Sequence, residues 1–426
     1  MAGINKVLYL AAHGGFDGQA VALGGGAAVF NLLVRQWTGR APFLLEQVTP
    51  AILGEAAPAA RDLTRFSESE YARFCRAFSQ AATRRVLQED PTSTAVLVND
   101  VSEGPDFERL AAAGFRIATI YHVDVVAYIA RIYLRGAVAP WSLTRLWRAL
   151  ETAGLSKAVP GILKLIFSQQ AASVRFSRHL IVPSSGMKLT LRRCYPPLDP
   201  ARVRVLPWGC PPADCSREDA HREALNIRAE LGVPADACIV LALSRISPEK
   251  GQDLLLRALL DWERRGLPSR PIWVFICGEA AFMQGAAFEK KLHAMAGRLR
   301  KIRVLFPGYV TGARKVGFLS LAGVYVFPSR HESYGLTLME AMAAGLPSLS
   351  LEHDGSRESL PDGCGVMIRK DDPRGVVKAL SMELEALIND RERRVKMGRS
   401  AALSARLQPF SAAADTLARL LLCENA

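Results

Sequence analysis

PSRHESYGLTLMEAMAAGLPSLS, the stretch Pro328–Ser350, decides the fold of this chain because it joins a buried strand to a helix through a short loop. The apolar, β-branched run Leu321–Pro328 predicts a strand that stops at its proline. We expect a helix over Gly335–Ala344, with Ser333 as its cap and Gly345 as its left-handed stop. A strand, a tight loop and a helix in this order are typical of a parallel α/β sheet.

Two glutamates belong to this loop and helix, Glu332 and Glu340, with seven residues between them. The free N–H groups and the positive end of the helix favour an anionic ligand at the carboxyl edge of the strand. Glu332 lies in the loop, where it can reach such a ligand, and we expect Glu340, further along the helix, to be more buried. A glutamate on such a helix is also explained without function, as a paired or solvated side chain.

Strands and helices alternate along the chain in two series. The first series of predicted strands is Lys6–Ala12, Ala41–Val48, Thr94–Asp100, Arg116–His122, His179–Ser184 and Val203–Gly209. The second series is Ala237–Arg245, Ile272–Gly278, Ile302–Tyr309, Gly323–Ser329 and Leu346–Glu352. Helices are predicted at Tyr71–Gln88, Asp106–Ala113, Gln252–Arg265, Ala287–Leu299, Gly375–Asn389 and Ala412–Cys423. The alternation predicts two α/β halves with doubly wound sheets, joined by the proline-rich linker Cys210–Asp219 and facing each other across a cleft.

Composition bounds the class of protein. The chain has 426 residues, 50% hydrophobic and 22% charged, which predicts a globular protein of two or three domains. No apolar run approaches the roughly 18 residues that span a bilayer, and Val7–Ala12 is too short for a signal segment. The eight cysteines are scattered without a C-x-x-C pair, which favours a reducing cytosol with neither disulfides nor zinc.

The net charge of +13 is unevenly spread, because eleven basic residues between Val125 and Tyr195 meet one acidic residue, Glu151. Aromatic residues such as Trp147 and Phe167 are interleaved with them. A basic, aromatic-rich amphipathic segment favours contact with an anionic membrane surface or an anionic acceptor. It equally fits a solvated face of core helices in an arginine-rich protein. Nucleic-acid binding is not favoured, because no recognised nucleic-acid-binding module accompanies the charge.

Three further motifs follow predicted strands and carry polar groups. Arg245 and Lys250 of SRISPEKG lie between a strand and a helix, so we expect both to point into the cleft. The loop Ala12–Gln19 contains glycines, Gly15 among them, that let a backbone approach a ligand closely. His122 ends a strand at the edge where open α/β sheets bind ligands. Each motif also has a plain explanation, as incidental surface charge, a turn or a structural histidine.

Together these motifs resemble the retaining family 4 glycosyltransferases, which have the GT-B fold of two facing Rossmann-like domains. The family's Pro-Ser, Glu, aromatic-Gly, Glu-Ala-Met-Ala and Gly-Leu-Pro pattern is met residue by residue in Pro328–Ser350, and its Arg…Glu-Lys-Gly pattern in Ser244–Gly251. The chain departs from the pattern where HDG (His353–Gly355) replaces Gly-Gly and where Cys210 follows Trp-Gly, which leaves the donor's sugar open.

The resemblance implies an arrangement of domains. Residues 1–210 would form an acceptor-binding domain and residues 211–408 a nucleotide-sugar-binding domain, both Rossmann-like. The terminal segment 409–426 would be a helix that crosses back onto the first domain.

The resemblance also implies a role for each site residue. Glu332 and His122 would be catalytic, beside the transferred sugar, and Glu340 would hydrogen-bond the ribose hydroxyls. Arg245 and Lys250 would bind the donor phosphates. The remaining donor-binding positions would be Gly15, Tyr309, Val310, Ser333, Tyr334, Gly335, Leu336 and Thr337. Further candidates for acceptor contacts are His13 and Asp124.

A departing nucleoside diphosphate develops negative charge, which an enzyme must neutralise with a metal or with fixed cations. The chain has no D-x-D motif, so we expect no metal and no cofactor, with Arg245 and Lys250 carrying this work. A leaving phosphate oxygen can take the acceptor proton, so no carboxylate nucleophile is needed.

The predicted function is metal-independent, retaining transfer of a sugar from a nucleotide sugar to a hydroxyl of a glycan or glycolipid. Family analogy places it in bacterial cell-surface polysaccharide or glycolipid biosynthesis, in the cytoplasm or peripherally on the inner face of the cell membrane. We expect no nucleic-acid partner.

Two other classes of protein fit part of the pattern. A non-catalytic GT-B homologue that binds nucleotide sugars or lipids would not need the full set of two cations and two glutamates. A dinucleotide-binding oxidoreductase would need a G-x-G-x-x-G fingerprint and an acidic residue about twenty positions on, and the chain has neither.

Overall fold

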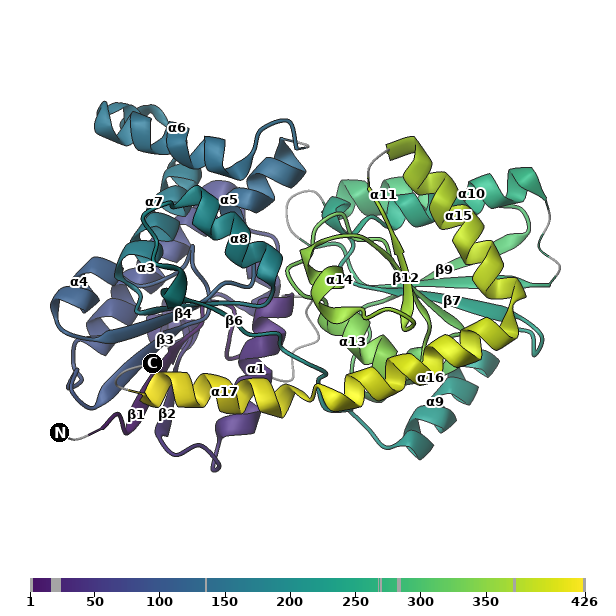
Figure 1. Ribbon diagram of the computed structural model, residues 1–426, viewed down its shortest axis with the longest axis horizontal. Coiled ribbons are helices and arrows are strands. Elements are labelled where there is room, and N and C mark those ends of the chain that lie inside the picture. Colours follow the sequence, from purple (N-terminus) through teal and green to yellow (C-terminus); the bar gives the residue numbers. More distant parts are fainter. Residues whose placement is uncertain are drawn as a thin grey trace. The chain divides into compact units, whose positions relative to one another are not determined.

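The computed structural model describes residues 3–16, 24–134, 136–266, 268, 270–281, 285–370 and 373–423. The chain divides into two compact units. The first unit contains Leu23–Trp208 together with the N-terminal strand and Ser411–Ala426, and the second contains Gly209–Phe410. In each unit, helices cover both faces of a single sheet (Figure 1).

The sheet of the first unit is parallel, with the strand order β2-β1-β3-β4-β5-β6. Its strands are β1 (Lys6–Leu10), β2 (Leu44–Val48), β3 (Thr94–Val98), β4 (Arg116–Ile120), β5 (His179–Val182) and β6 (Val203–Val205). Every residue of β3 is buried, as expected for a central strand covered by helices on both faces. Leu44, at the start of the edge strand β2, is 65% exposed.

The helices of the first unit connect these strands and pack on both faces of the sheet. They are α1 (Gly25–Trp37), α2 (Ala60–Leu63), α3 (Glu68–Val86), α4 (Phe107–Ala112), α5 (Val125–Tyr128), α6 (Pro140–Thr152), α7 (Gly161–Phe176), α8 (Ser185–Cys194) and the C-terminal α17 (Phe410–Leu422). Trp37 donates a hydrogen bond from its indole N–H to the carbonyl of Ala414, 3.2 Å away. This bond fastens the last helix of the chain to the first.

The second unit repeats the plan with the parallel order β12-β11-β10-β7-β8-β9. The strands are β7 (Cys238–Leu243), β8 (Ile272–Cys277), β9 (Ile302–Gly308), β10 (Val324–Phe327), β11 (Ser348–Leu351) and β12 (Gly365–Ile368). The helices are α9 (Arg217–Glu230), α10 (Gln252–Arg265), α11 (Gly285–Ala296), α12 (Gly312–Leu321), α13 (Leu336–Ala343), α14 (Asp354–Ser359), α15 (Pro373–Asn389) and α16 (Arg391–Leu407). The α/β class with two parallel sheets is therefore confirmed.

The described part of the second unit contains elements that the sequence did not predict, among them strand β12 and helices α9, α12, α14 and α16. Strand β12 was not predicted, because four residues that begin with glycine are too short to display a period. Helix α9 begins at Arg217, inside the expected linker Cys210–Asp219. Ser216 starts it, because its hydroxyl accepts a hydrogen bond from the amide of Asp219 at 3.1 Å. No helix within the described ranges is long and apolar enough to span a bilayer.

Candidate functional site

Strand order selects one edge of each sheet as a ligand site. In an open α/β sheet, ligands bind outside the carboxyl ends of the strands where the order reverses. In the second unit that point lies between β7 and β10, which pair directly. The loops that follow these two strands, Ser244–Gly251 and Pro328–Gly335, are therefore neighbours. They are the two loops that the sequence motifs singled out.

Arg330 joins the two loops. Its guanidinium donates two hydrogen bonds to the carboxylate of Asp253, at 2.8 and 2.9 Å, and a third to the carbonyl of Pro248 at 2.7 Å. Its backbone amide donates to the carbonyl of Glu249 at 2.7 Å. Asp253 is buried, so this bidentate pair fixes the spacing of the loops. Arg330 lay inside the quoted motif, but nothing in the sequence indicated its partners.

Gly251 brings the two loops into direct contact. It has φ +67°, and a Cβ atom there would lie 2.0 Å from the carbonyl oxygen of Pro328. Only glycine fits this position, both for its backbone conformation and for the space available. The glycine of the EKG motif is therefore explained by the close packing of the loops.

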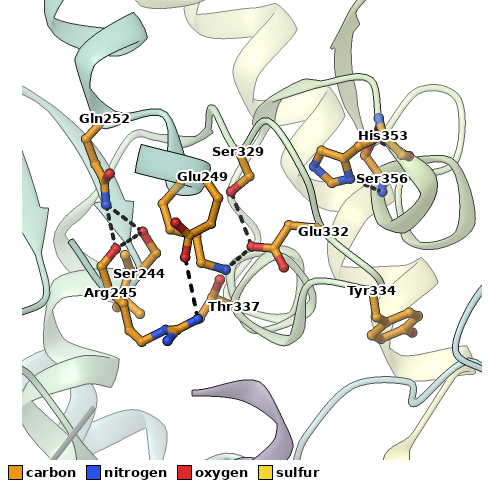
Figure 2. A network of polar contacts seen from close by, with 12 residues as sticks. Ser244, Arg245, Glu249, Gln252, Ser329, Glu332, Tyr334, Thr337, His353 and Ser356 are labelled. Carbon is orange, nitrogen blue, oxygen red and sulfur yellow. Dashed lines mark hydrogen bonds and ion pairs between the residues drawn. The ribbon is translucent and has the colours of Figure 1, made fainter. Parts of the chain in front are cut away.

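Both cations of the first loop are paired with carboxylates (Figure 2). Lys250 binds the Oε1 atom of Glu332, and the hydroxyl of Ser329 donates to the same oxygen at 3.3 Å. Arg245 lies 3.7 Å from the carboxylate of Glu249, whose pKa is lowered by the charges of Arg245 and Lys250 against its burial. The structure thus brings Arg245, Lys250 and Glu332 together at one edge of the sheet.

Helix α13 begins immediately after these residues. Its N-cap is Gly335, with φ +110°, and not Ser333 as the sequence suggested. The expectation was wrong because the chain enters the helix through a left-handed turn that only glycine adopts readily, which leaves Ser333 two residues too early. Gly345 was predicted correctly as the stop, with φ +79°. The amide of Leu338 donates to the carbonyl of Gly335. The amides of Leu336 and Thr337 come before this first helical hydrogen bond and belong to the N-terminal end of the helix.

Two tyrosine hydroxyls make hydrogen bonds close to the turn that begins α13. The Tyr325 hydroxyl lies 2.8 Å from the hydroxyl of Thr337. The Tyr334 hydroxyl accepts a hydrogen bond from the amide of Gly209 at 2.8 Å. Figure 2 shows the Tyr334 ring directed away from Glu332. The predicted donor-binding residues Thr337 and Tyr334 therefore use their side chains for the scaffold.

Glu340 projects from α13 and is paired as well. Lys315 of α12 lies 2.9 Å from its Oε1 atom and 2.8 Å from the carboxylate of Asp214. The exposed fraction of the Glu340 side chain is 17%, against 15% for Glu332, so the two side chains are buried to a similar extent, whereas we expected Glu340 to be the more buried. Burial raises the pKa of Glu340, and Lys315 opposes that rise.

Tyr309 and Val310 follow β9 at the same edge of the sheet. Val310 is buried and Tyr309 partly so. Burial raises the pKa of Tyr309, and the charges of Lys315 and Glu340 act on it. These two predicted donor-binding residues thus lie within electrostatic reach of the Glu340 pair.

His353 is a residue of this edge that the sequence showed only as a departure from a pattern. Its Nδ1 accepts a hydrogen bond from the amide of Ser356 at 2.9 Å. Burial and neighbouring cations hold its pKa well below the usual value, so the ring is neutral and its proton lies on Nε2. That nitrogen is buried and has no hydrogen-bond partner within the described residues. Figure 2 shows the ring turned towards the Glu332 side.

In the first unit the strand order reverses between β1 and β3. Asp100 follows β3, and its carboxylate accepts from the amide of Ala12 at 3.1 Å and lies 3.6 Å from Nδ1 of His13. Tyr71 of α3 donates to Glu103 and lies 3.3 Å from the other nitrogen of His13. The sequence predicted His13 here but missed the two carboxylates.

His122 lies beside this cluster. Its Nε2 is 2.9 Å from Oδ1 of Asn99, which also accepts from the hydroxyl of Tyr9. His122 must therefore donate through Nε2, which leaves Nδ1 as a hydrogen-bond acceptor. Burial lowers its pKa to about 4, so the ring is neutral at neutral pH.

Two other predicted residues of the first unit have local roles. Gly15 adopts φ +78°, and a Cβ there would lie 2.8 Å from the hydroxyl of Thr49. Asp124 is buried and caps α5 through the amide of Ala127, at 2.9 Å, while Gln170 donates to the same oxygen at 3.1 Å. The rest of the glycine loop after Phe16, up to Gln19, lies outside the described residues.

No group of three or more His, Cys, Asp or Glu side chains within the described residues is arranged to hold a metal ion.

Comparison with protein families gives a match over the second unit. Residues 224–403 match the family model described as Glycosyl transferases group 1. This region contains both loops and helix α13.

Relatives with similar sequences carry the name D-inositol 3-phosphate glycosyltransferase. That of Streptomyces coelicolor is 35% identical over 191 residues, which are 44% of this chain and 40% of the relative. That of Corynebacterium aurimucosum is 26% identical over 318 residues, 71% of this chain and 73% of the relative. In the first three relatives the match spans only 40–41% of their length.

Solved structures resemble the whole chain. Anabaena HepE, solved in complex with UDP and glucose, has a TM-score of 0.64 at 16% identity and covers 98% of this chain and 99% of its own. Sucrose-phosphate synthase from Thermosynechococcus elongatus has a TM-score of 0.70 at 17% identity, with 98% of each chain covered. At these identities the likeness shows the fold alone, which is that of the GT-B glycosyltransferases. On its sequence, the region 224–403 is similar to the glycosyl transferases group 1 family.

Proposed function

We propose that this protein is a metal-independent, retaining glycosyltransferase that moves a sugar from a nucleotide sugar to a hydroxyl of a glycan or glycolipid. The observation that carries this proposal is the pair of loops fastened by Arg330, which holds Arg245 and Lys250 beside Glu332 and the start of α13. Fixed cations and the N-terminus of a helix at one sheet edge are what a departing pyrophosphate requires.

The donor would occupy this edge in a defined orientation. Its pyrophosphate would lie against Arg245, Lys250 and the first amides of α13, and its ribose against Glu340. The base would lie at Tyr309 and Val310. Each cation is paired with a carboxylate, so donor binding would exchange or share those pairs rather than expose a new charge.

The acceptor substrate would bind to the first unit. His122 is neutral and offers Nδ1 as an acceptor, which suits a hydroxyl of the transferred sugar. Glu332, in the second unit, would orient the transferred sugar of the bound donor. A phosphate oxygen of the leaving group would take the proton of the attacking hydroxyl, so the bond to the sugar forms on the face that the nucleotide leaves.

Binding and transfer assays separate this proposal from the other two classes. Thermal unfolding should be shifted upward by one of UDP, GDP and ADP and not by NAD, because only ligands that bind the folded state stabilise it. UDP-glucose, the ligand of a HepE complex with the same fold, is the first donor to test. Turnover should persist in EDTA, and NMR should show a product with the donor's anomeric configuration.

The possible outcomes each decide something. A protein that binds a nucleoside diphosphate but neither transfers nor hydrolyses any nucleotide sugar is a binding module. A thermal shift with NAD alone would instead favour the dinucleotide-binding oxidoreductase. Turnover abolished by EDTA would contradict metal independence.

A membrane-borne acceptor is supported by one segment of the first unit. Between residues 133 and 157, five large apolar side chains and three basic side chains are exposed; this basic–apolar segment contains Tyr133, Leu134, Val138, Arg145, Leu146, Arg148, Leu155 and Lys157. Trp147 and Phe167 of the same segment are core residues instead, stacked at 5.2 Å. Arg135 lies outside the described residues. Exposed apolar groups among cations suit an anionic lipid surface.

Vesicle sedimentation tests whether the basic–apolar segment binds an anionic membrane. The protein should sediment at low salt with vesicles containing phosphatidylglycerol and not with phosphatidylcholine alone. Arg145→Glu should weaken that binding, because each basic residue near an anionic membrane contributes about 1 kcal/mol. Arg399→Glu, at an exposed position on α16, is the matched control and should change vesicle binding far less. Wild-type protein that ignores anionic vesicles would remove the membrane from the proposal.

A further inference from the structure

Lys315 stands between two carboxylates that come from distant parts of the second unit. It projects from α12, lies 2.9 Å from Oε1 of Glu340 on α13, and lies 2.8 Å from Asp214 in the segment before α9. The three side chains are 17 to 29% exposed, so water screens the contacts only in part. No motif pointed to Lys315 or Asp214.

The ionisation of Glu340 depends on this lysine. Burial raises the pKa of Glu340, the charge of Asp214 raises it further, and Lys315 lowers it. Lys315 itself is charged at any physiological pH, since its two partners raise its pKa to about 12. Without Lys315, desolvation and Asp214 would act together to protonate Glu340.

Among the described residues, Lys315 is the cation that acts on the pKa of Glu340, and the other groups that the charge of Glu340 affects are not basic. These groups are Cys210, Tyr309 and Tyr325, from the segment before α9, the end of β9 and β10. Burial raises the pKa of each, so all three are neutral at neutral pH. Helix α16, which also packs on α13, approaches it through Gly398 against Gly345.

The chemistry of a ribose makes that ionisation matter. A carboxylate accepts hydrogen bonds from two neighbouring hydroxyls, whereas a protonated carboxyl loses acceptor capacity. Lys315 contacts Oε1 of Glu340 and leaves Oε2 to a ligand. We infer that Lys315 is a positioning residue, which keeps Glu340 ionised and held in place for the vicinal hydroxyls of the donor nucleotide's ribose. The inference deepens the proposed function and rests on it.

The test is the pH dependence of nucleotide binding. Calorimetry would measure the Kd of the nucleoside diphosphate for wild type and Lys315→Met between about pH 6 and about pH 9, a range chosen to bracket the raised pKa of a buried carboxyl. Loss of hydrogen bonds to a charged acceptor predicts a Kd about ten- to a hundred-fold higher in the variant near pH 6. The difference should shrink towards pH 9, where Glu340 ionises again. The ratio of the two Kd values at each pH is the quantity to compare, because the nucleotide's own terminal phosphate titrates at about pH 6 in both experiments.

Further variants separate positioning from a merely structural role. Lys315→Arg should restore wild-type affinity, because it keeps the charge. Glu340→Gln should bind weakly at every pH, and adding Lys315→Met to it should cost nothing more. Arg314→Met is the matched control: it lies on the same helix and pairs with Glu223 and Glu230 of α9. It should leave the Kd and its pH dependence unchanged.

Each remaining outcome overturns something specific. Lys315→Met protein that is folded by circular dichroism and binds like wild type at all pH values overturns the inference alone. So does a loss that is the same at every pH, or one that persists in the Glu340→Gln background. Wild-type protein that binds no nucleoside diphosphate overturns the inference and the proposed function together.

Discussion

The two candidate ligand edges of this molecule both lie where the strand order of a sheet reverses, but their side chains have opposite chemistry. At the edge of the second unit, Arg245, Lys250 and Lys315 each face a carboxylate across an ion pair. At the edge of the first unit, neutral His122 is held by an amide, and a tyrosine and a histidine bridge two carboxylates. A reversal of strand order thus decides where a ligand binds, and the side chains decide what it is.

The difference has a physical consequence for the proposed reaction. Paired cations are fixed in place before the donor arrives, so they need little reorganisation when negative charge develops. Neutral imidazole and carboxylate oxygens suit hydroxyl groups, which carry no charge to neutralise. The comparison therefore predicts that charge removal damages the second unit's edge most, and that protonation damages the first.

Lys250→Ala should have the largest effect. Loss of one preorganised charge at a leaving group costs about 10²–10³ in turnover, and it also leaves the partly buried Glu332 carboxylate without its cation. Lys290→Ala, on the exposed face of α11, is the matched control and should keep the wild-type rate. The measurement is the initial rate of sugar transfer or donor hydrolysis with proteins of identical circular dichroism. A Lys250→Ala rate above a tenth of wild type would mean that this edge does not hold the leaving group.

His122 should have an intermediate effect, visible in acid stability. Its folded pKa of about 4 lies below the unfolded value of 6.5, so the unfolded chain binds more protons between these limits. The free energy of unfolding should therefore fall as pH drops from 6.5 towards 4, by up to roughly 3 kcal/mol from this group. Urea denaturation at several pH values would measure it.

His122→Gln should remove that part of the acid sensitivity, and transfer activity should fall as well if the ring orients the sugar. His221→Gln, at an exposed position on α9, is the matched control and should leave the acid sensitivity as in wild type. An unchanged slope in His122→Gln would show that the buried neutral histidine is not what acid attacks in the first unit.

The sequence alone predicted strands β7 and β10, the two loops that follow them and helix α13 of the second unit, because continuous apolar runs and fixed motif spacings are local signals. It did not predict the side-chain contacts that hold these two loops and the helix together. Arg330 and Asp253 are 77 positions apart, and Lys315 and Glu340 are 25 apart. Such pairs exist only once the sheet has ordered its strands. The error at Ser333 was local: residue type suggested a cap, while the positive φ of Gly335 took that position.

Tyr334→Phe should have the smallest effect on the transfer rate. It tests, within the second unit, the difference between side chains that support the fold and side chains that bind a ligand. The Tyr334 hydroxyl accepts from the amide of Gly209 in a buried contact, so the variant leaves that amide unsatisfied at a cost of about 1–2 kcal/mol of stability. Because its ring points away from Glu332, the transfer rate should change by less than about two-fold. Tyr133→Phe, with a side chain 49% exposed, is the control for loss of a hydroxyl. A large loss of rate with unchanged stability would instead place the Tyr334 hydroxyl in the donor site and remove the division between scaffold and ligand groups at this turn.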